Sequence, residues 1–441
     1  MILMKIKRLF ITLILLAIAV ISFPEPARAF CGFYVAKADA KLYNKSSQVI
    51  IARNGDRTVL TMANDYQGEI EDFALVVPVP VILTQEQVQV GNSKIIERLD
   101  AFSAPRLVEY FDSDPCGINV RPEDMLYRTR GETVAVPQSR EKTDNALGVT
   151  VEQQFTVGEY DIVILSAKES NGLETWLKQN GYKIPSAASQ LLSPYIRGGL
   201  KFFVAKVNLQ EYANTGFKSL RPLMMAYESP KFMLPIRLGM INAKDEQDLI
   251  VYLLSPKGQI ELTNYRTIKI PSDIEVPEFI AQEFKNFYQA MFKKSHERAG
   301  KKIAFLEYTW DTNNCDPCSA QPLNSEELKQ AGVFWLNSDR LPNVFITRLR
   351  VRYARDKFPE DLQFQETANH QLFQGRYIIH HPYREEANCD AAKDYYQSVK
   401  KRQEKEAQTL VQLTGWNINE ILKKINFVEA KQNAWWNSIW R

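Results

Sequence analysis

The residues with the clearest capacity for chemistry are two cysteines separated by two positions, in Cys315-Asp316-Pro317-Cys318. In a thiol–disulfide oxidoreductase such a pair lies at a helix N-terminus, which lowers the pKa of the first thiol and makes it nucleophilic. Here residues 303–308 are predicted as a strand before the pair, but the next helical pattern begins only near Ser325. We therefore interpret the pair as a structural disulfide, closed within the loop or with Cys389. Redox catalysis and a metal half-site are the alternatives.

Three further cysteines, Cys31, Cys116 and Cys389, bring the total to five. We predict a bridge between Cys31 and Cys116, which would fix the start of the mature chain. Five is an odd number, so at least one thiol stays free or pairs between chains. Cys389 is the candidate free thiol, or a small buried apolar residue.

The small number of histidines limits the metal sites that this chain could form. The chain has four histidines: His296, His370, His380 and His381. A zinc site would need His380 or His381 together with Cys389 or the CxxC pair. Adjacent residues on a strand point to opposite faces, so the two neighbours are poorly placed to share one ion. We expect no bound metal and no other cofactor.

Carboxylates gather in the loop before residue 73. They are Asp65, Glu69, Glu71 and Asp72. A hydrolase with paired carboxylates could be built there, although acidic loop residues are more often simply solvated. The sequence contains no Gly-x-Ser-x-Gly elbow and no phosphate-binding glycine loop. It therefore offers no catalytic residue that can be assigned.

The elements that would position these residues begin with strands. Residues 49–53 and 57–62 flank Asn54-Gly55-Asp56, which predicts a hairpin. Residues 73–81 are predicted as a buried strand, with Pro78 and Pro80 at an edge or at its end. Residues 93–111 have a helical pattern that restarts at Ser103 and Pro105.

Later segments alternate between the two periodicities. Helices are predicted at 172–180, from Pro277 onward, at 390–414 and after Asn417. Strands are predicted at 149–165, 201–209, 223–227, 232–240, 249–254, 259–262, 303–308, 344–353, 362–366 and 376–380. The predicted class is α+β, with largely antiparallel sheets, interspersed helices and a helical C-terminal tail.

The predicted organisation has four parts. They are a signal peptide at 1–29, a main α/β portion at 30–275 with a polar excursion at 117–147, a second α/β portion at 276–388 containing the CxxC pair, and a helical tail at 389–441. The tail ends in a tryptophan-rich stretch with Trp435, Trp436 and Trp440. These rings could contact an envelope surface or a protein partner, or pack back on the chain.

The first 29 residues have the layout of a secretory signal peptide. Basic residues precede an apolar run too short to span a bilayer, and Ala27-Arg28-Ala29 supplies small residues at a cleavage site. We predict cleavage after Ala29 and a periplasmic or extracellular location, with no later transmembrane span. Retention of the segment as an anchor is the alternative.

Removing the signal peptide takes four basic residues and one acidic residue from a net charge of +3, so the mature chain is formally neutral. A neutral chain gives no electrostatic basis for binding nucleic acid.

Several phrases occur together in a familiar order. They include Cys31-Gly32-Phe33-Tyr34-Val35, residues 62–68 (MANDYQG), residues 73–80 (FALVVPVP), residues 104–110 (APRLVEY), Asp114-Pro115-Cys116, residues 173–185 (LETWLKQNGYKIP), residues 201–207 (KFFVAKV), the CxxC motif and Gln374-Gly375-Arg376-Tyr377. Over roughly residues 30–385 the chain resembles the bacterial family labelled domain of unknown function 2330. The resemblance implies an exported protein and transfers no catalytic residue.

These observations favour an exported, non-enzymatic binding or envelope-associated module stabilised by disulfides. The alternative is an enzyme outside the cytoplasm, either a thiol–disulfide oxidoreductase that uses Cys315 and Cys318 or an unrecognised hydrolase.

Overall fold

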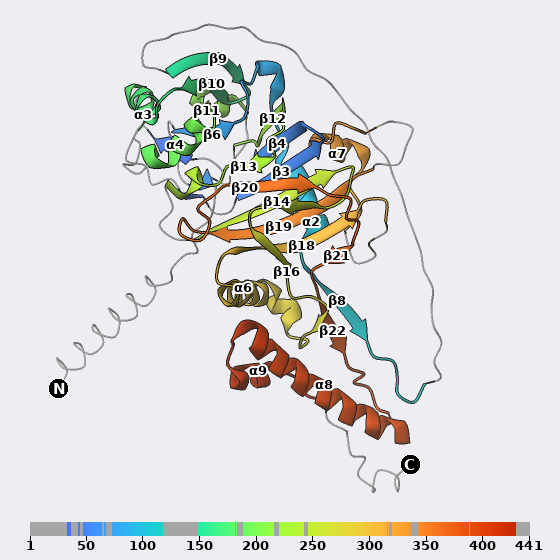
Figure 1. The fold of residues 1–441 in the computed structure, drawn as a ribbon. Coiled ribbons are helices and arrows are strands. Elements are labelled where there is room, and N and C mark those ends of the chain that lie inside the picture. The colour runs from blue at the N-terminus through green and yellow to red at the C-terminus, as the bar shows by residue number, and fades with distance from the viewer. Residues whose placement is uncertain are drawn as a thin grey trace, which may run out of the picture.

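A computed structural model describes most of the chain (Figure 1). The described residues are 33–36, 43–44, 47–63, 66–67, 73–117, 149–180, 182, 188–215, 220–241, 246–314, 316, 320–336, 343–387 and 389–428. Two large sheets form the body, and a helical unit lies at one end beyond a β-ribbon. Strands and helices are interspersed and most strand pairs are antiparallel, which confirms the predicted α+β class.

The smaller of the two large sheets has five antiparallel strands. Their order is β1 (Phe33–Ala36), β6 (Phe73–Val79), β11 (Lys201–Val207), β10 (Tyr160–Ala167) and β9 (Val149–Val157). Pro78 of β6 pairs with Phe202 of β11 but lies beyond the register of β1, so its missing N–H costs no ladder bond on that side. β6 ends at Val79, so Pro80 lies just after the strand and Pro78 one residue before its end, as expected for prolines predicted at an edge or at the end of the strand. Helices α3 (Ser170–Gln179) and α4 (Ala188–Arg197) pack on one face.

The larger sheet has nine strands. Its order is β16 (Arg266–Lys269), β18 (Ile303–Asp311), β19 (Phe345–Tyr353), β14 (Gln247–Ser255), β3 (Ser47–Asn54), β4 (Arg57–Ala63), β12 (Leu223–Glu228) and β7 (Val88–Val90), with β21 (Phe373–Gln374) paired to β18. The β3–β4 hairpin turns where predicted, and Gly55 takes φ +61° at the first central position. Strands from both sides of position 275 share this sheet.

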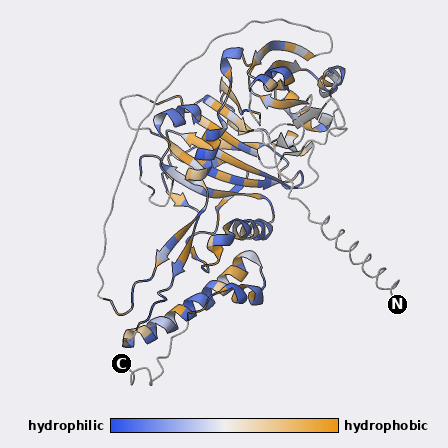
Figure 2. Cartoon of the chain, turned by 180° about the vertical axis from the view of Figure 1, so that it is seen from behind, coloured by the Kyte–Doolittle hydropathy of each residue, from blue (hydrophilic) through white to orange (hydrophobic). Residues whose placement is uncertain are grey.

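The main core lies between the two large sheets. Leu75 and Val77 of β6 meet residues such as Leu60 of β4 and Val251 of β14, and all four are at most 2 % exposed. Seen from behind, the apolar strands of these sheets contrast with the hydrophilic helices at the far end (Figure 2). Burial on both faces of the central strands explains their almost continuous apolar runs.

The opposite face of the nine-stranded sheet carries a buried charge network. On β19, Arg348, Arg350 and Arg352 share one face because strand side chains alternate. Arg348 donates to Glu307 of β18 at 2.7 Å, and Arg352 holds Asp248 of β14 through two bonds of 2.7 Å. Although burial opposes it, Arg352 and Arg350 hold the pKa of Asp248 below its ordinary value. The network lies under α6 (Ile280–Arg298), the helix predicted to begin after Pro277.

A parallel ribbon leaves this body. Strands β8 (Arg106–Phe111) and β22 (Arg376–His381) pair along their whole length, and β17 (Ile274–Glu275) lies on the other side of β22. The helical prediction across residues 105–111 is therefore wrong, because helix α2 (Ser93–Ser103) ends before Pro105. Pairing with β22, more than 260 positions away, overrides the local pattern.

The ribbon leads to the C-terminal helices α8 (Asp390–Thr414) and α9 (Ile418–Lys424), as Figure 1 shows. Both helices were predicted, the second after Asn417. The side chain of Asn417 caps α9 by accepting from the backbone N–H of Asn419. Ala407 and Leu410 of α8 pack with Phe287 and Met291 of α6.

The remaining elements are short. They are β2 (Tyr43–Asn44), β5 (Tyr66–Gln67), η1 (Gln85–Gln87), α5 (Leu209–Thr215), β13 (Met233–Leu234), η2 (Leu238–Ile241), β15 (Ile260–Leu262), α7 (Ser325–Gln330) and β20 (Leu362–Glu366). No helix among the described residues is both long enough and apolar enough to cross a bilayer.

Candidate binding site

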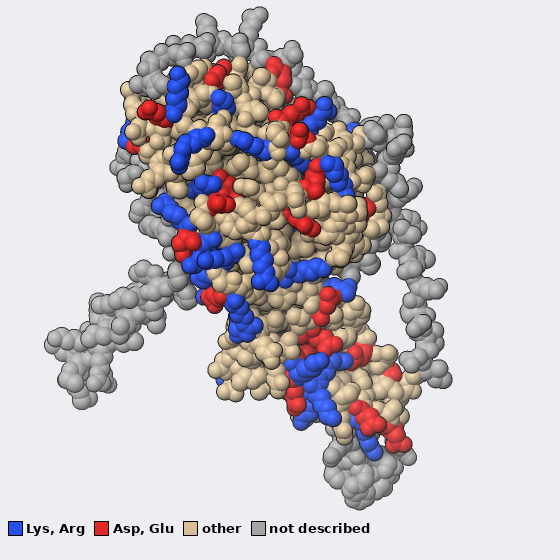
Figure 3. All heavy atoms as spheres, in the orientation of Figure 1, with Lys and Arg blue, Asp and Glu red and all other residues tan. Residues whose placement is uncertain are grey.

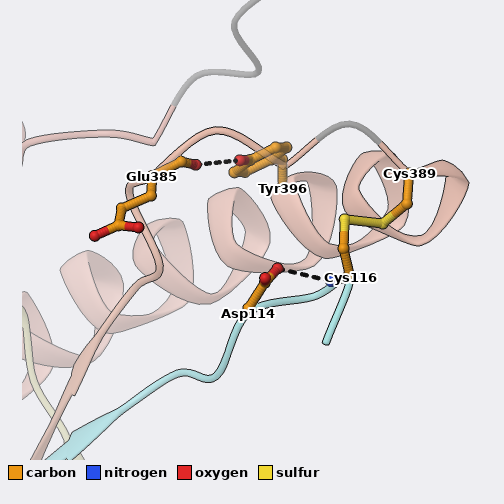
Figure 4. Close-up of a disulfide and its surroundings, with 5 residues drawn as sticks. All are labelled: Asp114, Cys116, Glu385, Cys389 and Tyr396. Atoms are coloured by element: carbon orange, nitrogen blue, oxygen red, sulfur yellow. Dashed lines mark hydrogen bonds between the residues drawn. A yellow bond between two sulfur atoms is a disulfide. The ribbon is translucent and has the colours of Figure 1, made fainter. Parts of the chain in front are cut away.

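One disulfide joins Cys116 to Cys389, and the two Cα atoms are 5.8 Å apart (Figure 4). Cys116 follows β8, and Cys389 is the residue immediately before α8. The backbone N–H of Cys116 donates to Asp114 at 2.8 Å, which fixes the turn that presents the sulfur. The bond therefore ties the end of the ribbon to the start of the longest helix.

This bond corrects two predictions. Cys116 does not pair with Cys31, and Cys389 is not a free thiol. The reason is topological: β8 and β22 are parallel, so the segments that follow them emerge at the same end of the ribbon. Cys116 follows one strand and Cys389 the other. Sequence spacing cannot reveal this pairing, because it depends on a contact between distant strands.

Other predicted site residues lie outside the described part of the chain. They are Cys31, Cys315, Cys318, Asp65, Glu69, Glu71, Asp72, Trp435, Trp436 and Trp440. Between the two cysteines of the CxxC motif, Asp316 is described and buried. It accepts hydrogen bonds from Tyr308 at 3.1 Å and from Gln374 at 2.8 Å.

The histidines do not converge on one centre. His296 is buried, which lowers its pKa, and its Nε2 lies 3.0 Å from the carbonyl oxygen of Arg352. His381 lies between Glu109 at 2.6 Å and Glu278 at 3.1 Å. Cys389 is oxidised and cannot serve as a thiolate ligand. Among the described residues, no group of three or more histidine, cysteine or carboxylate side chains is arranged to hold a metal ion.

Helix α8 is also held to the ribbon by ion pairs around Asp112. This carboxylate accepts from Arg402 and from the Tyr395 hydroxyl, each at 2.7 Å. Against the opposing effect of burial, these two bonds lower the pKa of Asp112. Charged side chains of both signs gather over this end of the molecule (Figure 3). These contacts hold the helix against the ribbon.

One carboxyl group of α8, that of Glu406, is buried close to other carboxylates. Glu406 is 4 % exposed, and its Oε1 has no hydrogen-bond partner among the described residues, although Arg402 Nε lies 3.7 Å away. Burial, then Glu275, Glu278 and Asp112 nearby, raise its pKa to about 8 against the opposing effect of Arg402. The direction of the shift favours the protonated form of Glu406.

An open apolar pocket lies on the outer part of the nine-stranded sheet. Its volume is about 360 Å³, within the range of small-molecule sites. Val59 of β4 with Met224 and Ala226 of β12 form the floor, and Val333 and Phe334 form a wall. Phe334 remains 42 % exposed, which is unusual for so large an apolar side chain.

The wall is brought close to the sheet by Gly332. This residue has φ +93°, and a Cβ there would lie 2.7 Å from a methyl carbon of Val59. Helix α7, just before it, begins with a capping box between Asn324 and Glu327. Glu327 also accepts from Arg98 of α2 at 2.8 Å, so the wall stands on a fixed support. The same contact helps to lower the pKa of Glu327, although burial opposes the shift.

A second, polar hollow lies beside the apolar pocket, and Phe334 lines both. Its volume is about 400 Å³, and its other lining residues are Asn54, Asp56, Arg57, Glu228 and Trp335. The rings of Phe334 and Trp335 meet edge to face with centroids 5.0 Å apart. The Asn54–Asp56 turn, singled out for its geometry, thus borders the site. The pocket itself was missed, since its lining comes from four separate segments. The pair Phe334-Trp335 beside Gly332 was its only signal in the sequence.

The fold and the pocket define a disulfide-linked α+β protein with an open apolar pocket. The chain belongs to the family labelled domain of unknown function 2330, described as an uncharacterized protein conserved in bacteria, and it matches that family over residues 25–365. This confirms the resemblance seen in the sequence. No curated protein and no solved structure matches the chain.

Proposed function

We propose that this protein is an exported, non-enzymatic binding module whose site is the apolar pocket beside Phe334. The observation that carries the proposal is the open pocket itself, about 360 Å³ in volume and walled by a half-exposed phenylalanine. Ligand sites are mostly apolar hollows of this size with a few polar groups at the rim. Here Gln87, Gln89 and Lys329 supply such groups.

Export is supported by the signal-peptide layout of residues 1–29 and by the Cys116–Cys389 bond. Disulfides persist in oxidising compartments and are rare in the cytosol of mesophilic cells. In the periplasm or outside the cell, the tryptophans at 435, 436 and 440 would offer contacts to the envelope or to a protein partner.

Binding is tested by titrating the mature chain, residues 30–441, with 3-methylindole in a calorimeter. Saturable binding is expected, and Ala226→Trp should abolish it because the added ring fills the pocket from its floor. Phe334→Ala should weaken it at least several-fold. The matched control is Leu372→Ala, because Leu372 is 40 % exposed and does not line the pocket. Equal binding by all four proteins, or no binding by the unaltered chain, would overturn the proposal.

Export is tested by fractionating cells that express the full chain. The expected product lies outside the cytoplasm and begins at Phe30. Ala29→Arg should block the cut, because a small residue is required at that position. A cytoplasmic product that still begins at Met1 would contradict the export proposal.

A further inference from the structure

The apolar pocket and the polar hollow adjoin at Phe334, which lines both. Their volumes are about 360 and 400 Å³, so each has room for one part of a small molecule. A ligand seated against Met224 and Ala226 would reach the polar hollow past the ring of Phe334. The chemistry of that hollow then decides what the far end of the ligand should carry.

The polar hollow is lined by two carboxylates and one guanidinium. Arg57 is already paired with Glu228 at 2.6 Å. Among the described residues, Asp56 has one long ion pair, 3.4 Å from Arg53, and its side chain is 70 % exposed. A carboxylate has about four acceptor positions, so this one can accept from a further donor. With Asp56, Glu228 and Arg57, the lining of the hollow carries a formal charge of −1.

Two aromatic rings line the same hollow. Phe334 and Trp335 meet edge to face, with an interplanar angle of 87°, so the two rings are not stacked flat on each other. Aromatic faces attract cations, and a ring combined with a carboxylate is a recurrent way to recognise an ammonium group. At the apolar pocket the rim charges of Glu86 and Lys329 are opposite in sign, so that side carries no comparable preference.

We propose that the site takes a small organic cation, with its apolar body beside Met224 and Ala226 and its ammonium group between Asp56 and the two rings. This inference rests on the proposed function and specifies the ligand class of the same pocket. Asp56 is the residue that selects the charge, and Phe334 contacts both parts of the ligand. An anionic ligand would meet the carboxylates of Asp56 and Glu228 in the hollow, and Arg57 in the lining is already paired with Glu228.

The test compares three probes of similar ring size in calorimetry: tryptamine, the neutral 3-methylindole and the anion indole-3-propionate. Tryptamine is expected to bind about five- to tenfold more tightly than 3-methylindole, the gain of one exposed ion pair and one cation–π contact. Asp56→Asn should remove that difference and leave 3-methylindole binding unchanged. The matched control is Asp356→Asn, because the Asp356 side chain is 68 % exposed and lies outside the site.

The outcomes separate the two proposals. Equal binding of tryptamine and 3-methylindole, or tighter binding of indole-3-propionate, would overturn the cation inference while the binding function stands. A tryptamine preference that survives in Asp56→Asn would overturn the assignment of Asp56. Failure of all three probes to bind would overturn both the ligand class and the proposed function.

Discussion

Removing the Cys116–Cys389 bond should cost this protein more than loss of an ordinary cross-link. The two cysteines are 273 positions apart in a chain of 441 residues, so the bond constrains more than half of the unfolded chain. On the chain-entropy description of cross-links, closing a loop of that length lowers the free energy of folding by about 5 to 6 kcal/mol. Cys116→Ser with Cys389→Ser should therefore lower the midpoint of urea unfolding substantially, with the slope against urea raised by a more expanded unfolded state.

The structure also predicts where the loss appears first. Without the bond, the N-terminal half of α8 is held to the ribbon chiefly through Asp112, which pairs with Arg402 and Tyr395. Limited trypsin digestion should then cut at Lys400 or Lys401 under conditions that leave the oxidised protein intact. Peptide mass analysis locates the cut.

A control separates the bond from the side chains. Reducing the unaltered protein with a phosphine should reproduce both the urea shift and the trypsin pattern of the double serine variant. Unchanged unfolding and unchanged digestion in the serine variant would refute this reasoning. A shift in the variant alone would assign the effect to packing around the two positions.

Three other predictions follow from buried groups. The pKa of Glu406 is near 4.5 in the unfolded chain and about 8 in the folded protein, so between these pH values only the folded state binds the proton. The contribution of Glu406 to stability therefore falls as pH rises through that window and is lowest above it. Glu406→Gln should flatten this dependence and raise the melting temperature at pH 9, and an unchanged pH profile would contradict the assigned pKa. Arg348→Met removes the nearer of two arginines paired with Glu307, which is fully buried, and leaves Arg350 at 3.9 Å. It should destabilise the fold by about 3 to 5 kcal/mol in urea titrations. A loss below about 1 kcal/mol would show that the charge network is not a single unit. Gly332→Ala forces a carbon onto Val59 and should both destabilise the protein by about 1 to 3 kcal/mol and weaken 3-methylindole binding, measured by thermal melting and calorimetry.

Local patterns predicted the elements whose stability is itself local. The helix from Pro277 and the helix at 390–414 appear as α6 and α8, because a 3.6-residue apolar period needs only one surface to pack on. The Asn54–Asp56 turn also formed as expected, since positive φ is a property of Gly55 itself. The strand at 106–111 was read as helix because its partner, β22, lies far along the chain and supplies the ladder that the local sequence does not specify.

The same distinction explains the site. A disulfide between Cys116 and Cys389 and a pocket floored by Val59 and Ala226 both depend on which strands become neighbours, and strand order is not written in any single segment. Residue type indicated oxidised cysteines but could not pair them. The turn at Asn54–Asp56 was predicted from its residue types, but nothing in that segment indicated that Phe334 would line the same hollow.

The disulfide also joins a region inside the family match to a region outside it. Cys116 lies inside the stretch that matches the bacterial family, whereas β22, Cys389 and α8 lie beyond its end at residue 365. The pocket lies wholly inside the family stretch, since its lining residues run from Val59 to Leu336. A binding role placed in the pocket can therefore be common to the family, while the helical unit tied to the ribbon belongs to the part of the chain where this protein can differ. Loss of the disulfide should accordingly loosen α8 and lower stability, yet leave the affinity of the pocket for 3-methylindole unchanged in the folded protein. The effect of the disulfide on stability and the binding of a ligand in the pocket can therefore be measured independently of each other.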